Sequence, residues 1–166
     1  GVLIDSKYAM ELAWDSVQKK FDVNSSFSEY EKYIGLPFEQ ILKNLNVDPN
    51  RFLDIANYYF SQTSRYKNLI RLNPYVHEVL YWLEKKRIYT GIVTSKDYLR
   101  TFELVQNFNI NVDILVTPEL TLRGKPHSDP IIYAAKTLKV ERKNVLFIGD
   151  MISDMLCARN SNCKYL

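Results

Sequence analysis

The chain has 166 residues, of which 46% are hydrophobic and 13% aromatic, with only five glycines and six prolines. This composition excludes disordered, collagen-like and low-complexity proteins, and it allows one domain, or one domain that carries a small second one. The formal net charge is +3, and Lys and Arg are scattered rather than clustered among aromatics, so we expect no nucleic-acid partner. Uncharged apolar runs such as 145–148 fall far short of the roughly 20 residues that cross a bilayer, so we expect no membrane association.

The few cysteines and histidines argue against a structural zinc site. Cys157 and Cys163 lack Cys-x-x-Cys spacing, and His77 and His127 are the only histidines. A reduced, cytoplasmic setting is therefore expected. No charged-then-apolar signal segment opens the chain, which gives no indication of secretion.

Residues 7 to 72 are predicted to form a block of helices. One apolar stripe recurs at steps of three and four residues: Met10, Trp14, Val17 and Phe21. Ser28 and Glu31 have the spacing of a capping box, and Pro37 suits a first helical position. Asp48-Pro49 is a further helix start signal.

After Asn73-Pro74 short β-rich runs alternate with amphipathic stretches. The runs predict strands at 88–93, 113–116 and 145–148, and the start of another at 164–166. Helices are expected between them, one of them at about 129–138. This alternation predicts an α/β fold with a Rossmann-like parallel sheet, whose binding site lies at the carboxyl ends of the strands.

Hydroxyl and lysine side chains follow two of these strands. The strand at 88–93 runs into Thr94-Ser95-Lys96, whose hydroxyls and backbone amides suit an anion, although Ser95 could simply cap the next helix. Lys125, in Arg123-Gly124-Lys125-Pro126, could place its charge on a phosphate, or it could be a solvated loop lysine.

The strand at 145–148 ends in Gly149-Asp150, and Asp154 follows four residues later. The glycine permits a tight turn, so the two carboxylates can converge on one point, as Mg²⁺ requires. Alternatively, the carboxylates favour the helix N-terminus through its dipole. Thr94, Lys125 and Asp150 are each about one strand-helix unit apart, which would bring them to the same edge of one sheet.

Taken in order, five segments resemble the haloacid dehalogenase-like superfamily, and within it the phosphoglycolate phosphatase-like and β-phosphoglucomutase-like members with an inserted helical cap. The segments are Gly1-Val-Leu-Ile-Asp-Ser6, Gly35-Leu-Pro37, Val93-Thr94-Ser95-Lys96, Gly124-Lys125-Pro126 with Asp129-Pro130, and Gly149-Asp150 with Asp154. The resemblance covers essentially the whole chain. It implies an α/β core at 1–6 and 75–166, and a helical cap at 10–72.

The resemblance also implies an Mg²⁺-dependent phosphatase that acts on a small phosphorylated metabolite. Thr94 and the Ser95 amide would hold the transferring phosphoryl group, and Lys125 would neutralise it. Asp150 would bind Mg²⁺, with support from Asp154. An aspartate would attack phosphorus, a second aspartate would protonate the leaving alcohol, and water would hydrolyse the aspartyl phosphate.

One part of the family pattern is missing. In the family, a segment like 1–6 follows an apolar strand that ends in Asp-x-Asp, which holds the nucleophile and the general acid. This chain starts at Gly1 and stops three residues into a strand, so we expect a phosphatase fragment truncated at both ends, with an incomplete core and no activity of its own. The alternatives are a non-catalytic phosphate- or partner-binding domain, and a phosphomutase built on the same core.

Overall fold

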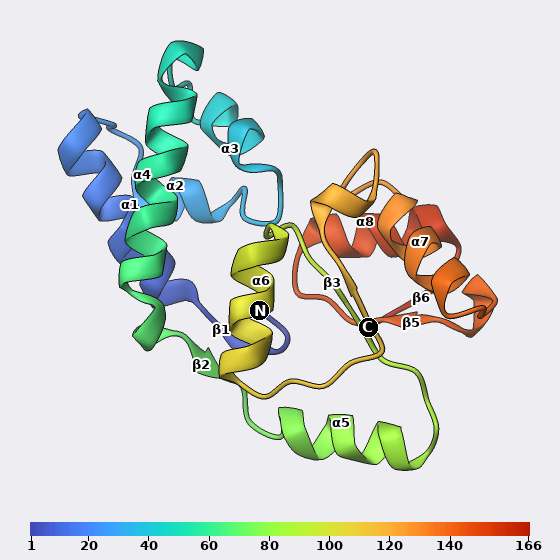
Figure 1. Ribbon diagram of the computed structural model, residues 1–166. Helices are drawn as coiled ribbons and strands as arrows, with labels where there is room; N and C mark the ends of the chain where they lie inside the picture. The colour runs from blue at the N-terminus through green and yellow to red at the C-terminus, as the bar shows by residue number, and fades with distance from the viewer. The chain divides into compact units, whose positions relative to one another are not determined.

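The computed structural model describes residues 1–166 (Figure 1). The chain divides into two compact units: a helical unit of Gly1 and Leu3–Asn73, and an α/β unit of Val2 and Pro74–Leu166. Each unit has a hydrophobic core of its own. No helix in either unit combines the length and the apolar character needed to span a membrane.

Helices make up most of the helical unit. In chain order it contains β1 (Ile4–Asp5), α1 (Lys7–Phe21), α2 (Phe27–Glu31), α3 (Phe38–Asn44), the 3-10 helix η1 (Pro49–Arg51), α4 (Phe52–Arg65), the 3-10 helix η2 (Lys67–Leu69) and β2 (Arg71–Leu72). The two longest helices, α1 and α4, pack against each other. The predicted stripe on α1 faces the core, because Trp14 and Val17 are completely buried.

Aromatic side chains form the centre of this core. The Trp14 ring stacks on Tyr30 with ring centroids 4.6 Å apart, and its Nε1 donates to the Ser25 carbonyl at 2.8 Å. The hydroxyls of Tyr30 and Tyr59 are hydrogen-bonded at 2.9 Å. These bonds satisfy polar atoms whose burial without partners would destabilise the core.

A short antiparallel ladder joins the two ends of the helical unit. Ile4 pairs with Leu72 and Asp5 with Arg71, and Asn73 N donates to the Leu3 carbonyl at 2.9 Å. The chain therefore enters and leaves this unit on neighbouring strands. Adjacent ends are the arrangement that allows one folded unit to be inserted within another.

One predicted helix start is wrong. The capping box is made by Ser26 and Glu29, not by Ser28 and Glu31: Glu29 N donates to Ser26 Oγ at 3.3 Å, and Ser26 N donates to Glu29 Oε2 at 2.7 Å. Phe27 is buried in the core, and the earlier start includes it in the helix. Tertiary packing thus selects between two sites with similar local signals.

The α/β unit alternates helices and strands, as predicted. It contains α5 (Val76–Lys85), β3 (Gly91–Val93), α6 (Tyr98–Asn107), β4 (Ile114–Val116), the 3-10 helix η3 (Pro118–Leu120), α7 (Asp129–Thr137), the 3-10 helix η4 (Arg142–Asn144), β5 (Leu146–Phe147), α8 (Ile152–Ser161) and β6 (Lys164–Tyr165). β3 is shorter than the predicted strand at 88–93. Its first predicted residue instead helps to end α5, since Ile88 N donates to the Leu83 carbonyl at 3.0 Å and Arg87 adopts a left-handed conformation.

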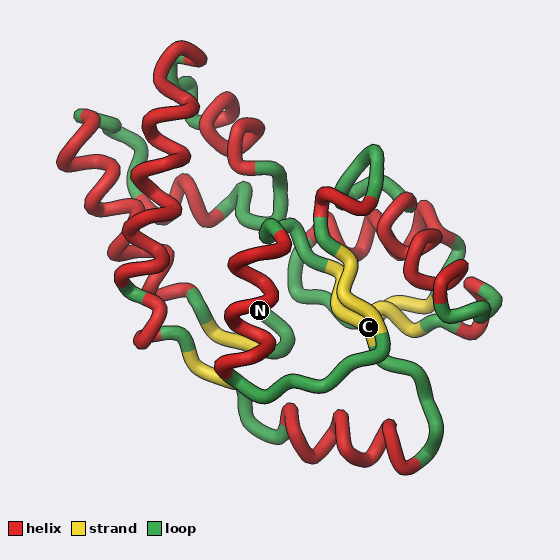
Figure 2. The backbone as a smooth tube through the Cα atoms, in the orientation of Figure 1, coloured by secondary structure: helices red, strands yellow, loops and turns green.

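The strands of this unit form two pairs (Figure 2), and both pairs are parallel. β3 pairs with β4 over Gly91–Ile114 to Val93–Val116, and β5 pairs with β6 over Leu146–Lys164 and Phe147–Tyr165. No ladder joins β3 to β5, so each of these strands has one edge without a strand partner. The parallel direction confirms the predicted fold class, but the strands do not form one continuous sheet.

Candidate active site

The carboxyl end of β3 carries the first candidate residues. Thr94 N donates to the Val116 carbonyl at 3.0 Å, which continues the β3–β4 ladder by one residue. Thr94 Oγ1 then accepts a hydrogen bond from Lys96 N at 3.1 Å. The chain therefore turns sharply at Ser95, and Thr94, Ser95 and Lys96 are all partly buried in this turn.

The alternative that Ser95 caps the following helix is wrong. α6 begins at Tyr98, and its cap is Asp97, whose Oδ1 accepts from Arg100 N at 2.9 Å. Burial raises the pKa of Asp97, but the hydrogen bonds and charge of Arg100 outweigh it, so the pKa lies below its ordinary value. Ser95 is thus left in the turn at the strand end rather than used as a helix cap.

Lys125 is not a solvated loop lysine. Its Nζ donates to Asp154 Oδ1 at 2.7 Å and lies 3.5 Å from the Val93 carbonyl oxygen. The side chains of Lys125 and Asp154 are only 10% and 6% exposed. Lys125 therefore connects the end of β3 to the start of α8 from a loop between them in sequence.

The turn after β5 depends on Gly149. A Cβ at this position would lie 2.4 Å from Asp154 Cβ, so only glycine allows the turn to approach α8 this closely. Asp154 Oδ2 accepts from Met151 N at 3.2 Å, which stabilises the first turn of α8. Asp150, on the same turn, is exposed. Asp154 therefore stabilises the helix start and also pairs with Lys125.

A second lysine lies close to the first. Burial lowers the pKa of Lys96 to about 8, with smaller contributions in the same direction from the charges of Arg100 and Lys125; Asp97 opposes them. Sequence reasoning identified the Thr94-Ser95-Lys96 turn but gave Lys96 no role. The sequence signal that could have pointed to Lys96 was its position directly after the two hydroxyl residues Thr94 and Ser95.

The donor set at this edge fits Mg²⁺ in a limited way. Proteins hold Mg²⁺ with one or two carboxylates, and water and substrate phosphate complete its octahedron. The exposed Asp150 carboxylate suits a direct ligand. Asp154 suits a supporting role, because its two oxygens already accept from Lys125 and from the backbone. No group of three or more His, Cys, Asp or Glu side chains that could hold a metal occurs in the structure.

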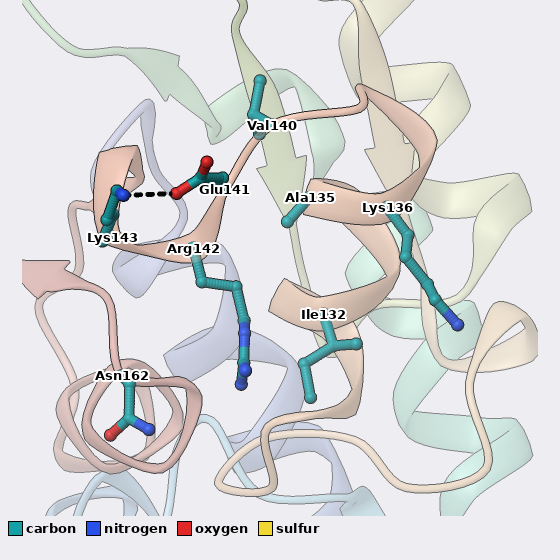
Figure 3. A pocket seen from close by; sticks show the side chains of 8 residues that line it. All are labelled: Ile132, Ala135, Lys136, Val140, Glu141, Arg142, Lys143 and Asn162. Carbon is teal, nitrogen blue, oxygen red and sulfur yellow. Dashed lines mark ion pairs between the residues drawn. The ribbon is translucent and has the colours of Figure 1, made fainter.

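A hollow of the α/β unit lies elsewhere. It has a volume of about 600 Å³ and is lined by Ile132, Ala135, Lys136, Val140, Glu141, Arg142, Lys143 and Asn162 (Figure 3). Glu141 and Lys143 form an exposed ion pair at its rim. η4, which supplies part of the lining, precedes β5, so this hollow is at the amino end of the strand and contains none of the candidate residues.

Comparison with known proteins agrees with the fold. The family model for haloacid dehalogenase-like hydrolases matches residues 1–166. A phosphoglycolate phosphatase of Nitrosococcus oceani is 26% identical over 176 residues, which cover 98% of this chain and 77% of that protein. A pyrophosphatase, PpaX, of Oceanobacillus iheyensis is 21% identical over 166 residues, which cover 99% of this chain and 77% of that protein.

Solved structures share the fold at lower identity. The crystal structure of a hydrolase from Pseudomonas syringae matches with a TM-score of 0.89 at 24% identity, over 98% of this chain and 78% of the other. The likeness therefore includes both the helical unit and the α/β unit. On the full-length match to the family model, the chain belongs to the haloacid dehalogenase-like hydrolases.

Proposed function

We propose that the protein is a magnesium-dependent phosphatase of small phosphate esters. The observation that carries this proposal is the buried pair of Lys125 and Asp154, 2.7 Å apart. Burial of an ion pair costs desolvation energy. This pair places the Lys125 ammonium beside the end of β3, which is followed by the hydroxyl residues Thr94 and Ser95. The relatives named as a phosphatase and a pyrophosphatase support the same class of reaction.

Each candidate residue has a specific role in this proposal. Thr94 Oγ1 and the Ser95 amide hold the transferring phosphoryl group, and the Lys125 ammonium neutralises the charge on its equatorial oxygens. Asp154 positions Lys125 through the 2.7 Å hydrogen bond. Asp150 is the magnesium ligand, and the bound ion would supply further charge neutralisation at the phosphate.

The nucleophile of the proposed reaction is an aspartate that these 166 residues do not include. No two aspartates of the chain are two positions apart, so there is no Asp-x-Asp segment. We propose that a strand with this segment pairs with the open edges of β3 and β5. Val145, Phe147 and Gly149 bond to β6 and its following residue, so the backbone groups of Leu146 and Ile148 face the other edge.

The reaction then proceeds in two steps. A carboxylate oxygen of the first aspartate attacks phosphorus, the bond from phosphorus to the ester oxygen breaks, and the second aspartate gives its proton to the leaving oxygen. Water then attacks the aspartyl phosphate and releases inorganic phosphate, with the second aspartate taking the proton from water. Thr94, Ser95 and Lys125 stay in place through both steps and stabilise the charged phosphoryl group.

The helical unit serves in this proposal as the inserted cap domain of the family. The antiparallel pairing of β1 with β2 supports it, because it brings the two chain connections of the unit together. A reducing, cytoplasmic setting is also proposed, since both cysteines are free thiols and Cys157 is buried.

A phosphate- or partner-binding domain without catalysis is the second candidate. The absence of Asp-x-Asp from these residues is the observation that favours it. Both candidates use the same turn and the same Lys125, so they predict the same phosphate binding. They differ in turnover once the missing carboxylates are supplied.

The test adds an apolar strand that ends in Asp-x-Asp directly before Gly1 and measures hydrolysis of an aryl phosphate with Mg²⁺. We expect turnover by the extended protein and only background rate for the 166-residue chain. A matched extension that ends in Asn-x-Asp should be inactive, since the amide is no nucleophile. In the active protein, Lys125→Ala and Asp150→Ala should each lower the rate by on the order of 10²-fold or more.

Two results would contradict the proposal. If the extended protein folds but hydrolyses none of a broad panel of phosphate esters, the binding domain is the better description. If the 166-residue chain itself hydrolyses the aryl phosphate and loses this activity in Asp150→Ala, the nucleophile lies among the residues described here.

A further inference from the structure

Lys125 lies in a tight turn of the chain, over residues 124–127. His127 N closes this turn by donating to the Gly124 carbonyl at 3.0 Å. On one side of Lys125, Gly124 is in open space, because a Cβ at this position would meet no atom within 4 Å. On the other side, Pro126 has no N–H that could anchor its backbone. The position of the turn therefore depends on the bonds that its carbonyl oxygens accept.

Side chains of α8 supply these bonds. Asn160 Nδ2 donates to the Pro126 carbonyl at 3.0 Å. Cys157 Sγ donates to the His127 carbonyl at 2.9 Å. Asp154, Cys157 and Asn160 follow one another at steps of three residues, which places them along one side of the helix. One side of α8 thus holds the backbone of the turn, through two carbonyls, and also the lysine ammonium, through a carboxylate.

Asn160 is too far along the helix to act on the lysine ammonium directly. It follows Asp154 by six residues, which corresponds to about 9 Å along the helix axis. It is also exposed, whereas Asp154 is buried. Its amide bonds to the carbonyl of the residue directly after Lys125. Any effect of Asn160 on the ammonium therefore passes through the backbone of the turn.

We propose that Asn160 is a positioning residue, which fixes the backbone of the turn so that the Lys125 ammonium stays on Asp154, where it meets the phosphate. This inference rests on the proposed function, because that function gives Lys125 its phosphate. The four-carbon stem of a lysine is flexible, so Asp154 restrains only one end of it. Because Asn160 fixes the other end, less freedom is lost when phosphate binds.

Nuclear magnetic resonance of the 166-residue chain can follow the Lys125 ammonium directly, and Lys125→Met assigns its signal by removing it. Asn160→Leu removes the donor and keeps a branched side chain of similar size. Asn160→Gln is the conservative variant, because it keeps the amide donor. Asn107→Leu is the matched control, since Asn107 is also exposed and also lies in the last turn of a helix, α6.

We expect the Lys125 ammonium protons to exchange with water about two- to tenfold faster in Asn160→Leu than in the wild type at pH 6, as loss of one hydrogen bond predicts. Asn160→Gln should restore slow exchange, and Asn107→Leu should leave it unchanged. Calorimetry at pH 7 should show the same order for inorganic phosphate, whose affinity should fall by about two- to tenfold in Asn160→Leu. A contact that only stabilised the fold would lower the urea midpoint without changing the exchange.

Three results would overturn the inference. Exchange at the wild-type rate in Asn160→Leu would show that the lysine does not depend on Asn160, even if phosphate binds. Equal acceleration of the exchange in Asn160→Leu and Asn107→Leu would indicate a general loosening of the unit. Weaker phosphate binding in Asn160→Leu with unchanged exchange would mean that Asn160 acts by a route other than Lys125.

The same measurements separate this inference from the proposed function. If Asn160→Leu accelerates the exchange as expected but the wild type binds no inorganic phosphate, the positioning of Lys125 is supported and the proposed phosphate site is contradicted. If the wild type binds phosphate and Asn160→Leu changes neither measurement, the phosphate site stands and the positioning role fails.

Discussion

The charge of Asp154 should contribute strongly to the stability of the α/β unit. The substitution Asp154→Asn keeps the size of the side chain and its ability to accept from Met151 N, but it leaves the Lys125 ammonium without its carboxylate. Because the two side chains are only 6% and 10% exposed, solvent screens the pair little. Loss of one partner from a buried pair costs about 3 to 5 kcal/mol.

Urea unfolding measures this cost. With a slope of about 2 kcal/mol per molar urea for a chain of this size, the midpoint should fall by about 1.5 to 2.5 M. The background variant Trp14→Phe leaves Trp82 on α5 as the only tryptophan, so its fluorescence follows the α/β unit alone. Lys125→Met combined with Asp154→Asn should regain part of the loss, since no unpaired charge then remains.

Asp129→Asn is the matched control for this experiment. Asp129 pairs with Arg123 at 3.0 Å, but the arginine side chain is 56% exposed, and exposed pairs contribute at most about 1 kcal/mol. The reasoning is refuted if Asp154→Asn and Asp129→Asn shift the midpoint equally. A shift of the urea midpoint below about 0.5 M for Asp154→Asn would also refute the reasoning.

Three further substitutions and one chemical modification test the local structure. Gly149→Ala should lower the free energy of unfolding by about 1 to 3 kcal/mol, because its Cβ would lie 2.4 Å from Asp154 Cβ; unchanged urea stability would mean that the turn is more open. Asp97→Ala should lower the free energy of unfolding by about 1 kcal/mol, because it removes the cap of α6. Ser95→Ala should lower it by less than about 0.5 kcal/mol in the same assay. The reverse order of the two effects would show that Ser95 is the cap. Burial raises the pKa of Cys157 to about 11, so mass spectrometry should find it unmodified after iodoacetamide treatment of the folded protein at pH 8 and modified after unfolding in urea; rapid modification of the folded protein would contradict the burial.

Local sequence patterns were sufficient to predict most helices and strands. The apolar stripe that includes Trp14 and Val17 predicted α1, and the short apolar runs after Pro74 predicted β3 to β6 close to their observed positions. These patterns work because they reflect helical and strand periods, which are properties of neighbouring residues. The same patterns placed Thr94 and Asp150 directly after strands; in the structure Thr94 directly follows β3, whereas Asp150 comes three residues after the end of β5.

The exact caps could not be predicted in this way. Ser26 and Ser28 each have a glutamate three residues later, and both Ser95 and Asp97 precede α6 with suitable side chains. The choice between such neighbours depends on which residues the helix must bury, and this is decided by tertiary packing.

The ion pair of Lys125 and Asp154 was likewise outside the reach of sequence patterns. The two residues are 29 positions apart, and their contact exists because the loop after β4 and the start of α8 meet near the end of β3. The lowered pKa of Lys96 also depends on the tertiary structure, since burial and then the charges of Arg100 and Lys125 act on it through space. The sequence by itself determined which chemical groups follow each strand, because the order of residues along the chain is set by covalent bonds. Only the tertiary structure decided which of these groups touch and which remain charged, because contacts and the local dielectric environment depend on how the strands and helices pack.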